Sequence, residues 1–288
     1  MSRSVTAEPL LGYVGLGSMG APMAMRLTGW PGGLIVHDVR AEAMAPFAAA
    51  GATTAAGLAE VATADLIEVT VLDDAQVRQV VAELAVHTAP GTVIALHSTI
   101  ADGTAAELAA ELAPHGVHVV DAPVSGGAGA AQKGELATMV GAPRDVYERV
   151  KPVFKQWASV VIHAGEPGAG TRMKLARNML TFTAFAAACE AMRLAEAAGL
   201  DLQALGRVVR HTDAQAGGPG AIMIRDNTHE IEPGHWLYDT FTHTRGLGEK
   251  DLSLALALGD ALGVDLPLAH IAMRGLADGL GVPHRTKE

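Results

Sequence analysis

A glycine-rich turn near the N-terminus constrains this chain more than any other feature. The turn reads Gly15-Leu16-Gly17-Ser18-Met19-Gly20 and follows the apolar run 10–14. In such a strand-to-helix connection the first glycine permits a tight turn, the second lets backbone approach a pyrophosphate, and the third lets the helix pack on the strand. The helix N-terminus then faces the phosphates. These six residues therefore predict a dinucleotide site.

An acidic residue at the end of a second apolar run supports this interpretation. The run 34–37 ends at Asp38, close to the spacing of about 20 residues at which a ribose-binding carboxylate is expected. A carboxylate there accepts hydrogen bonds from ribose hydroxyls and repels a 2′-phosphate, which favours NAD as the cofactor. Arg40 is close enough in sequence to reach a phosphate, so NADP stays open. We also expect Leu72, which ends a later apolar run, to contact the cofactor.

Composition excludes several classes of partner. The chain has 288 residues, of which 49% are hydrophobic and 18% charged, which is a globular composition long enough for two domains. Its formal net charge is −10 without a basic run, so we expect neither nucleic acid nor a membrane surface as a partner. The single cysteine, Cys189, is expected to be a small buried hydrophobe in a reducing compartment. No apolar segment has signal-peptide or membrane-spanning length, so we expect a cytoplasmic protein.

Short apolar runs alternate with longer Ala- and Leu-rich segments from residue 10 to about 163. This alternation predicts an α/β domain with a doubly wound parallel sheet. The expected strands are 10–14, 34–37, 66–72, 92–96, 117–120, 136–140 and 160–163. The expected helices are 41–50, 74–86, 102–113 and 145–156, several of which open with an aspartate that would serve as the N-cap.

The pattern changes at residues 165–168. Residues 169–198 contain no Gly or Pro, and Gly199 stands where a C-cap glycine belongs, which predicts one long helix. Its middle, 179–189, is apolar nearly all round and should be buried by more than one neighbour, as at a subunit interface. The later segments are expected to be helices near 202–210, 249–262 and 268–280. We therefore predict a Rossmann domain over 1–165 and an all-helical C-terminal domain over 166–288.

Two further segments carry candidate chemistry. In Asp121-Ala122-Pro123-Val124-Ser125-Gly126-Gly127, the hydroxyl of Ser125 and the amides of the two glycines could bind a carboxylate at the edge of the sheet where ligands bind; an ordinary loop turn is the alternative. Lys174 and Asn178 share a face near the start of the long helix. A partly desolvated Lys174 would be an acid or base, with Asn178 orienting a substrate hydroxyl; a solvated helix start is the alternative.

Taken together, these motifs resemble the β-hydroxyacid dehydrogenase family, whose best-known member is 3-hydroxyisobutyrate dehydrogenase. The resemblance rests on the glycine fingerprint, the 121–127 segment, the helix start with Lys174 and Asn178, and Lys250-Asp251-Leu252, and it covers about residues 10–280. It implies a Rossmann domain, a long interdomain helix, an all-helical C-terminal domain, and a homodimer or homotetramer.

The resemblance also implies a role for each matching residue. Lys174 would be the acid/base and Asn178 would position substrate. Lys250 would line the cleft near the nicotinamide with Asp251 as its ion-pair partner, while Ser125, Gly126 and Gly127 would bind the substrate carboxylate. Ser98 and Thr99 would lie near the nicotinamide ring. His97 stands where relatives often carry Asp.

The function that these residues favour is NAD-dependent oxidation of a small 3-hydroxy acid to its semialdehyde. The alternatives are a reductase of a small semialdehyde such as tartronate or succinic semialdehyde, and a catalytically silent NAD-binding scaffold, since fold alone does not fix function. We expect no metal, because the histidines at 211, 229, 235 and 243 lack ligand-like spacing and cysteine companions.

Overall fold

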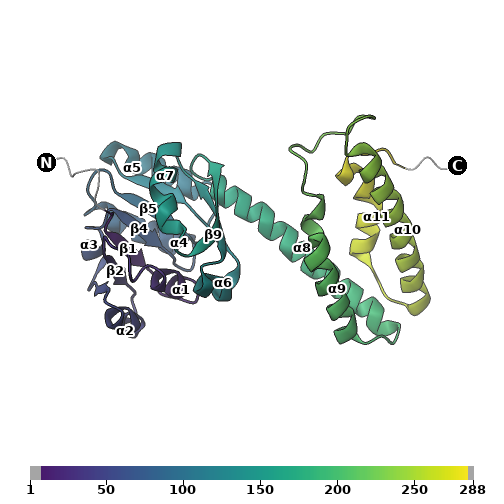
Figure 1. The fold of residues 1–288 in the computed structure, drawn as a ribbon, viewed down its shortest axis with the longest axis horizontal. Coiled ribbons are helices and arrows are strands. Elements are labelled where there is room, and N and C mark those ends of the chain that lie inside the picture. Colours follow the sequence, from purple (N-terminus) through teal and green to yellow (C-terminus); the bar gives the residue numbers. More distant parts are fainter. Residues whose placement is uncertain (1–7, 285–288) are drawn as a thin grey trace. The chain divides into compact units, whose positions relative to one another are not determined.

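The computed structural model describes residues 8–284, which divide into two compact units, one ending at Arg177 and the other beginning at Asn178. The first unit is built on one sheet, drawn with its helices in Figure 1. The strand order is β3-β2-β1-β4-β5-β6-β8-β7, and β9 pairs with β8. The strands are β1 Leu11–Val14, β2 Leu34–His37, β3 Thr53–Thr54, β4 Leu66–Val69, β5 Val93–Leu96, β6 His118–Asp121, β7 Val124–Ser125, β8 Leu136–Gly141 and β9 Ala158–Gly165.

The sheet is mostly parallel, with one departure from the prediction. The strands from β3 to β6 run parallel, and β9 is parallel to β8, but β8 is antiparallel to both β6 and β7. Strands β1, β4 and β5 are buried at every position, which explains why their sequences are apolar apart from Glu68 in β4. Their positions bring the loops that follow them to the same edge of the sheet.

Helices cover both faces of this sheet. They are α1 Gly20–Met25, α2 Ala41–Ala49, α3 Leu58–Val61, α4 Asp74–Ala85, α5 Thr104–Leu112, the 3₁₀ helix η1 Ala113–His115, α6 Gly127–Lys133 and α7 Arg144–Phe154. The expected aspartate caps were wrong in register. Asp73, not Asp74, caps α4, whereas Gly103 and Pro143 precede α5 and α7 without a side-chain cap.

Two hydrophobic clusters form the core of the first unit. Tyr13 lies in the cluster that holds α1, α2 and α7, whereas its neighbour Val14 lies in the cluster that holds α3, α4 and α5. This alternation follows from the two-residue period of a strand, and it assigns one helical layer to each face. The largest buried side chain of the first cluster is Trp157, next to Phe154.

The second unit is helical. Its elements are the greater part of α8 Ala169–Ala197, then α9 Leu202–Ala216, the 3₁₀ helix η2 Gly218–Ile222, α10 Tyr238–Leu262 and α11 Pro267–Leu280. Helix α10 begins well before the predicted residue 249. The carboxylate of Glu190 accepts hydrogen bonds from the backbone of Leu268 and Ala269, which caps α11 from α8. Because α8 belongs to both units, the limits 1–165 and 166–288 stay a prediction.

The middle of α8 is exposed in the single chain. Met179, Phe182 and Phe185 are between 61% and 69% exposed, and Cys189 is exposed as well. One copy of the chain therefore does not bury Cys189, and the expected burial of 179–189 at a subunit interface stays a prediction. None of the described helices is long and apolar enough to cross a membrane.

Candidate active site

The glycine fingerprint forms a turn that leaves space above it. Gly15 has a positive φ of 92°, and a Cβ at this position would collide with the carbonyl oxygen of Thr70. A Cβ at Gly20 would collide with the carbonyl oxygen of Gly15, so both positions require glycine for packing. A Cβ at Gly17 would meet nothing within 4 Å, so this backbone is open to close approach by a ligand.

A cavity of about 850 Å³ adjoins this turn, a size suited to a small-molecule or cofactor site. Four of the residues predicted to bind the cofactor line it, namely Gly15, Gly17, Asp38 and Leu72. Val39 and Leu72 are 94% and 83% exposed at the cavity, so two aliphatic side chains are available to a flat aromatic ring. Val39 was missed by the sequence analysis, although it directly follows the ribose-binding candidate. The open glycine, the carboxylate and the aliphatic pair together fit an adenine dinucleotide.

Asp38 is held in place by its own loop. One carboxylate oxygen accepts a hydrogen bond from the backbone of Leu16 at 2.7 Å, and the other accepts from the backbone and Nε of Arg40 at 2.9 and 3.1 Å. Burial by itself raises the pKa of Asp38, but the hydrogen bonds from Arg40 and Leu16 outweigh it and leave this pKa below its ordinary value. The carboxylate is therefore charged at neutral pH, and the guanidinium of Arg40 is directed to it.

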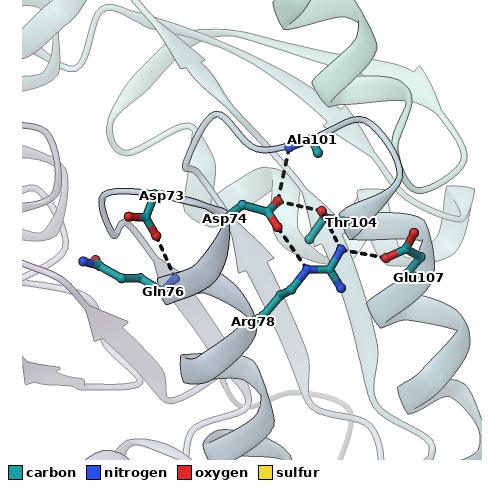
Figure 2. Close-up of polar contacts among 7 residues, drawn as sticks. All are labelled: Asp73, Asp74, Gln76, Arg78, Ala101, Thr104 and Glu107. Carbon is teal, nitrogen blue, oxygen red and sulfur yellow. Dashed lines mark hydrogen bonds and ion pairs between the residues drawn. The ribbon is translucent and has the colours of Figure 1, made fainter.

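The loop after β5 carries Ser98 and Thr99, and a polar network fixes it to α4. Ser98 Oγ donates to the carbonyl of Val71 at 2.7 Å and accepts from the Val71 amide at 3.0 Å. Further along the loop, Asp74 accepts hydrogen bonds from the amide of Ala101 at 3.2 Å and from Thr104 Oγ1 at 2.6 Å (Figure 2). The hydroxyl of Ser98 thus joins the ends of two strands at the cofactor edge.

Arg78 extends the same network to α5. It donates to Asp74 at 3.0 Å and to Glu107 at 2.6 Å, as Figure 2 shows. Hydrogen bonding from Thr104, opposed by burial and supported by Arg78, lowers the pKa of Asp74. This network was not predicted from the sequence, because its members lie on two helices and a loop that are far apart in the chain.

The segment 121–127 holds the beginning of α8. The fully buried carboxylate of Asp121 accepts hydrogen bonds from the backbone of Gly168 at 2.7 Å and of Thr171 at 2.5 Å. Gly126 and Gly127 have φ values of 134° and 77° and are exposed where α6 begins, and Ser125 beside them is half-buried. Residues 127–133, which the sequence analysis did not assign to a helix, form α6. A half-buried hydroxyl and two exposed glycines, of which Gly127 has open space around it, are available there to an anionic group.

Lys174 reaches this segment from α8. Its Nζ donates to the carbonyl oxygen of Val124 at 2.6 Å and lies 3.4 Å from Ser125 Oγ. Lys174 is 8% exposed, and burial, followed by the positive charge of Arg177, lowers its pKa from the ordinary value of 10.5. The solvated-lysine alternative is thereby wrong for the single chain, and two of the predicted site residues are brought together.

The other predicted residues lie in the second unit. Asn178 follows Lys174 by one turn of α8 and is half-buried. Lys250 Nζ pairs with Asp251 Oδ1 at 3.0 Å, as the resemblance implied, but both side chains are more than half exposed. Their place beside the substrate stays a prediction. Within residues 8–284, no group of three or more His, Cys, Asp or Glu side chains is arranged to hold a metal ion.

Comparison with known proteins gives consistent matches along the chain. Residues 10–165 match the NAD binding domain of 6-phosphogluconate dehydrogenase, and residues 168–280 match the NAD-binding domain of NADP-dependent 3-hydroxyisobutyrate dehydrogenase. An uncharacterized oxidoreductase of Mycobacterium tuberculosis is 64% identical over 97% of this chain and 96% of its own length.

Solved structures agree with these matches. The crystal structure of a protein assigned as an oxidoreductase from Mycobacterium avium has a TM-score of 0.94 and 74% identity, covering 96% of this chain and all of that one. The structure of 3-hydroxyisobutyrate dehydrogenase of Mycobacterium tuberculosis with L-serine has a TM-score of 0.67 and 30% identity, covering 94% and 93%.

Proposed function

The chain belongs to the β-hydroxyacid dehydrogenase family, NAD(P)-dependent oxidoreductases that act on CH–OH groups, and from this premise we propose that it oxidises a small 3-hydroxy acid to its semialdehyde with NAD. The observation that carries the proposal is Lys174, a buried lysine of lowered pKa that contacts Ser125. A nicotinamide, when bound, accepts the hydride from the substrate carbinol carbon.

The residues of this chain perform the remaining steps. Ser125 Oγ and the amides at Gly126 and Gly127 bind the substrate carboxylate, which places the hydroxyl toward Lys174. The neutral amine of Lys174 removes the hydroxyl proton as the carbon loses its hydride, so a carbonyl forms and the lysine becomes an ammonium. The Val124 carbonyl is positioned to stabilise that ammonium, because it already accepts a hydrogen bond from Nζ.

NAD is preferred over NADP in this proposal because Asp38 is charged and ordered. Its buried carboxylate repels a 2′-phosphate. The Nε of Arg40 pairs with Asp38 Oδ1 at 3.1 Å, so this cation is already engaged by Asp38. Binding a 2′-phosphate would require Arg40 to leave this ion pair.

The test is a substrate panel followed at the absorbance band of NADH. 3-Hydroxyisobutyrate, glycerate, L-serine and 4-hydroxybutyrate are each offered with NAD and with NADP, and the corresponding semialdehydes are offered with the reduced cofactors. The proposal expects turnover of at least one 3-hydroxy acid with a higher kcat/KM for NAD. Tight NADH binding without turnover in either direction would identify a silent scaffold.

The proposal includes a homo-oligomer that is located in the cytoplasm. A homodimer or homotetramer would cover the exposed apolar side chains of α8, among them Met179, Phe182 and Phe185. The single cysteine is consistent with a reducing cytoplasm. Light scattering on the purified protein tests the assembly, and a monomer at micromolar concentration would contradict it.

A further inference from the structure

A buried acid and a buried histidine face each other inside the sheet, outside the residues assigned above. Glu68 belongs to β4, and His97 directly follows β5. Their side chains are both 0% exposed, and His97 Nε2 lies 3.1 Å from Glu68 Oε2. Ionisable side chains are rarely buried so completely in an α/β core unless they have a specific partner.

The second ring nitrogen of His97 fixes the direction of hydrogen bonding. Nδ1 lies 2.8 Å from the carbonyl oxygen of Ala122. A carbonyl only accepts, so Nδ1 carries a hydrogen and donates it. The contact between Nε2 and Glu68 then holds one further proton, on the ring or on the carboxyl group. In either arrangement His97 is anchored at both ends, and its Nδ1–H is directed to Ala122.

The rest of the surroundings hold the imidazole in place without competing for its hydrogen bonds. The ring of Trp157 meets it edge-on at 5.1 Å and that of Phe154 at 5.4 Å between centroids. Tyr13 is the other titratable group near Glu68, but its hydroxyl pairs with Thr70 Oγ1 at 2.8 Å. Burial and then the charge of Glu68 raise the pKa of Tyr13, so this phenol stays neutral.

The carbonyl that His97 holds belongs to the segment that Lys174 contacts. Ala122 also donates its backbone N–H to the Leu96 carbonyl at 2.7 Å and accepts from Thr138 Oγ1 at 3.1 Å. Two residues later, the Val124 carbonyl accepts from Lys174 Nζ. A shift of Ala122 therefore moves the oxygen to which the lysine is bound.

We propose that His97, anchored by Glu68, is a positioning residue that fixes the segment 122–125 and thereby the position of Lys174. This inference rests on the proposed function, because it acts through the lysine assigned there. Stability alone does not account for the pair, since apolar residues of similar volume often replace a buried pair of ionisable side chains without loss of stability. Apolar residues could not donate a hydrogen bond to the carbonyl of Ala122, as His97 does.

The test compares substitutions that keep or remove the hydrogen bond to Ala122. His97→Asn retains a donor close to the place of Nδ1, and Glu68→Gln retains a donor for Nε2, so both are expected to keep native turnover of the best substrate of the panel. His97→Leu removes the donor and is expected to lower kcat about 10- to 100-fold, the order of a catalytic group misplaced by about 1 Å. NADH affinity is expected to stay unchanged.

A double-mutant cycle separates this inference from the proposed function. If His97 acts through Lys174, then His97→Leu lowers kcat in the native background but not in the Lys174→Ala background. If the reductions in kcat of the two single variants multiply in the double variant, the role of His97 is overturned and the proposed function is not affected. Native turnover of Lys174→Ala overturns the proposed function, and with it the premise of this inference.

Two further outcomes contradict the positioning role. Native kcat in His97→Leu shows that the hydrogen bond is dispensable, and an Asn variant as slow as the Leu variant shows that the ring, not the donor, is needed. If the Leu variant does not fold, the double variant Glu68→Leu/His97→Leu takes its place in the cycle. That variant buries no unpaired charge, so it is expected to fold while losing the same factor in kcat.

Discussion

Replacing Lys174 with alanine tests the central step of the proposed reaction. A positioned general acid or base contributes about 10²- to 10⁴-fold to a rate, so Lys174→Ala is expected to lower kcat for oxidation by at least roughly 10²-fold. That factor corresponds to about 2.7 kcal/mol of transition-state free energy at 1.36 kcal/mol per tenfold change. Lys174 is only 8% exposed, so bulk water does not readily take the place of its amine.

The same substitution has a separate and smaller structural effect. It removes the donor to the Val124 carbonyl, and a typical hydrogen bond contributes about 0.5–1.5 kcal/mol to the free energy of unfolding. Urea denaturation of the Lys174→Ala variant measures this effect, and NADH titration checks that the cofactor site is intact. Lys174→Arg is expected not to restore kcat, since arginine does not release a proton near neutral pH.

The pH dependence gives an independent measure. Oxidation needs the neutral amine, so kcat/KM rises with pH and levels off above the pKa of Lys174, which burial and then Arg177 hold below 10.5. For stability, the unfolded chain binds this proton more tightly, so the contribution of Lys174 rises with pH between its folded pKa and 10.5. Near-native kcat in the alanine variant, or a pH profile that it leaves unchanged, would refute the assignment.

Three further substitutions test neighbouring parts of the site. Asp38→Ser is expected to lower the ratio of kcat/KM for NAD to that for NADP, because it removes the ribose acceptor and frees Arg40; an unchanged ratio contradicts the cofactor assignment. Ser125→Ala is expected to raise KM for the hydroxy acid by the loss of a hydrogen bond to a charged group, about 1.5–3 kcal/mol, while NADH affinity measured by titration stays intact. Asp121→Asn turns an amide N–H toward one of two buried backbone donors, and urea denaturation is expected to show a loss of about 1–3 kcal/mol together with a lower kcat.

The sequence predicted those elements whose burial is complete. Strands β1, β4 and β5 are buried on both faces and are apolar apart from Glu68 in β4, so their positions were confirmed. A short, mostly apolar segment such as 136–140 does not show whether its strand is parallel or antiparallel to its neighbours, so the antiparallel orientation of β8 was not predicted. The strand β3 was missed because its two threonines are exposed and form only an edge pair.

The candidate site was predictable where a side chain carries the chemistry. Asp38, Ser125 and Lys174 stand at recognisable spacings, and the structure brings the last two within 3.4 Å. The network around Asp74 and the pair of Glu68 with His97 depend on contacts between elements distant in the chain, which no local pattern contains. Cys189 is exposed in the single chain, so its expected burial depends on a neighbouring copy and stays a prediction.

The segment 121–124 is short, but it makes three contacts that position the catalytic candidate Lys174. Its side chain at Asp121 holds the start of α8, its carbonyl at Ala122 accepts from His97, and its carbonyl at Val124 accepts from Lys174. Two of these three contacts are made by backbone, so the residue types between Asp121 and Ser125 matter chiefly for the path they give the chain. Pro123 fits this requirement, because its fixed φ limits the ways in which the two carbonyls can be oriented relative to each other. The lysine is thus positioned from two directions, through the helix that carries it and through the oxygen that it binds.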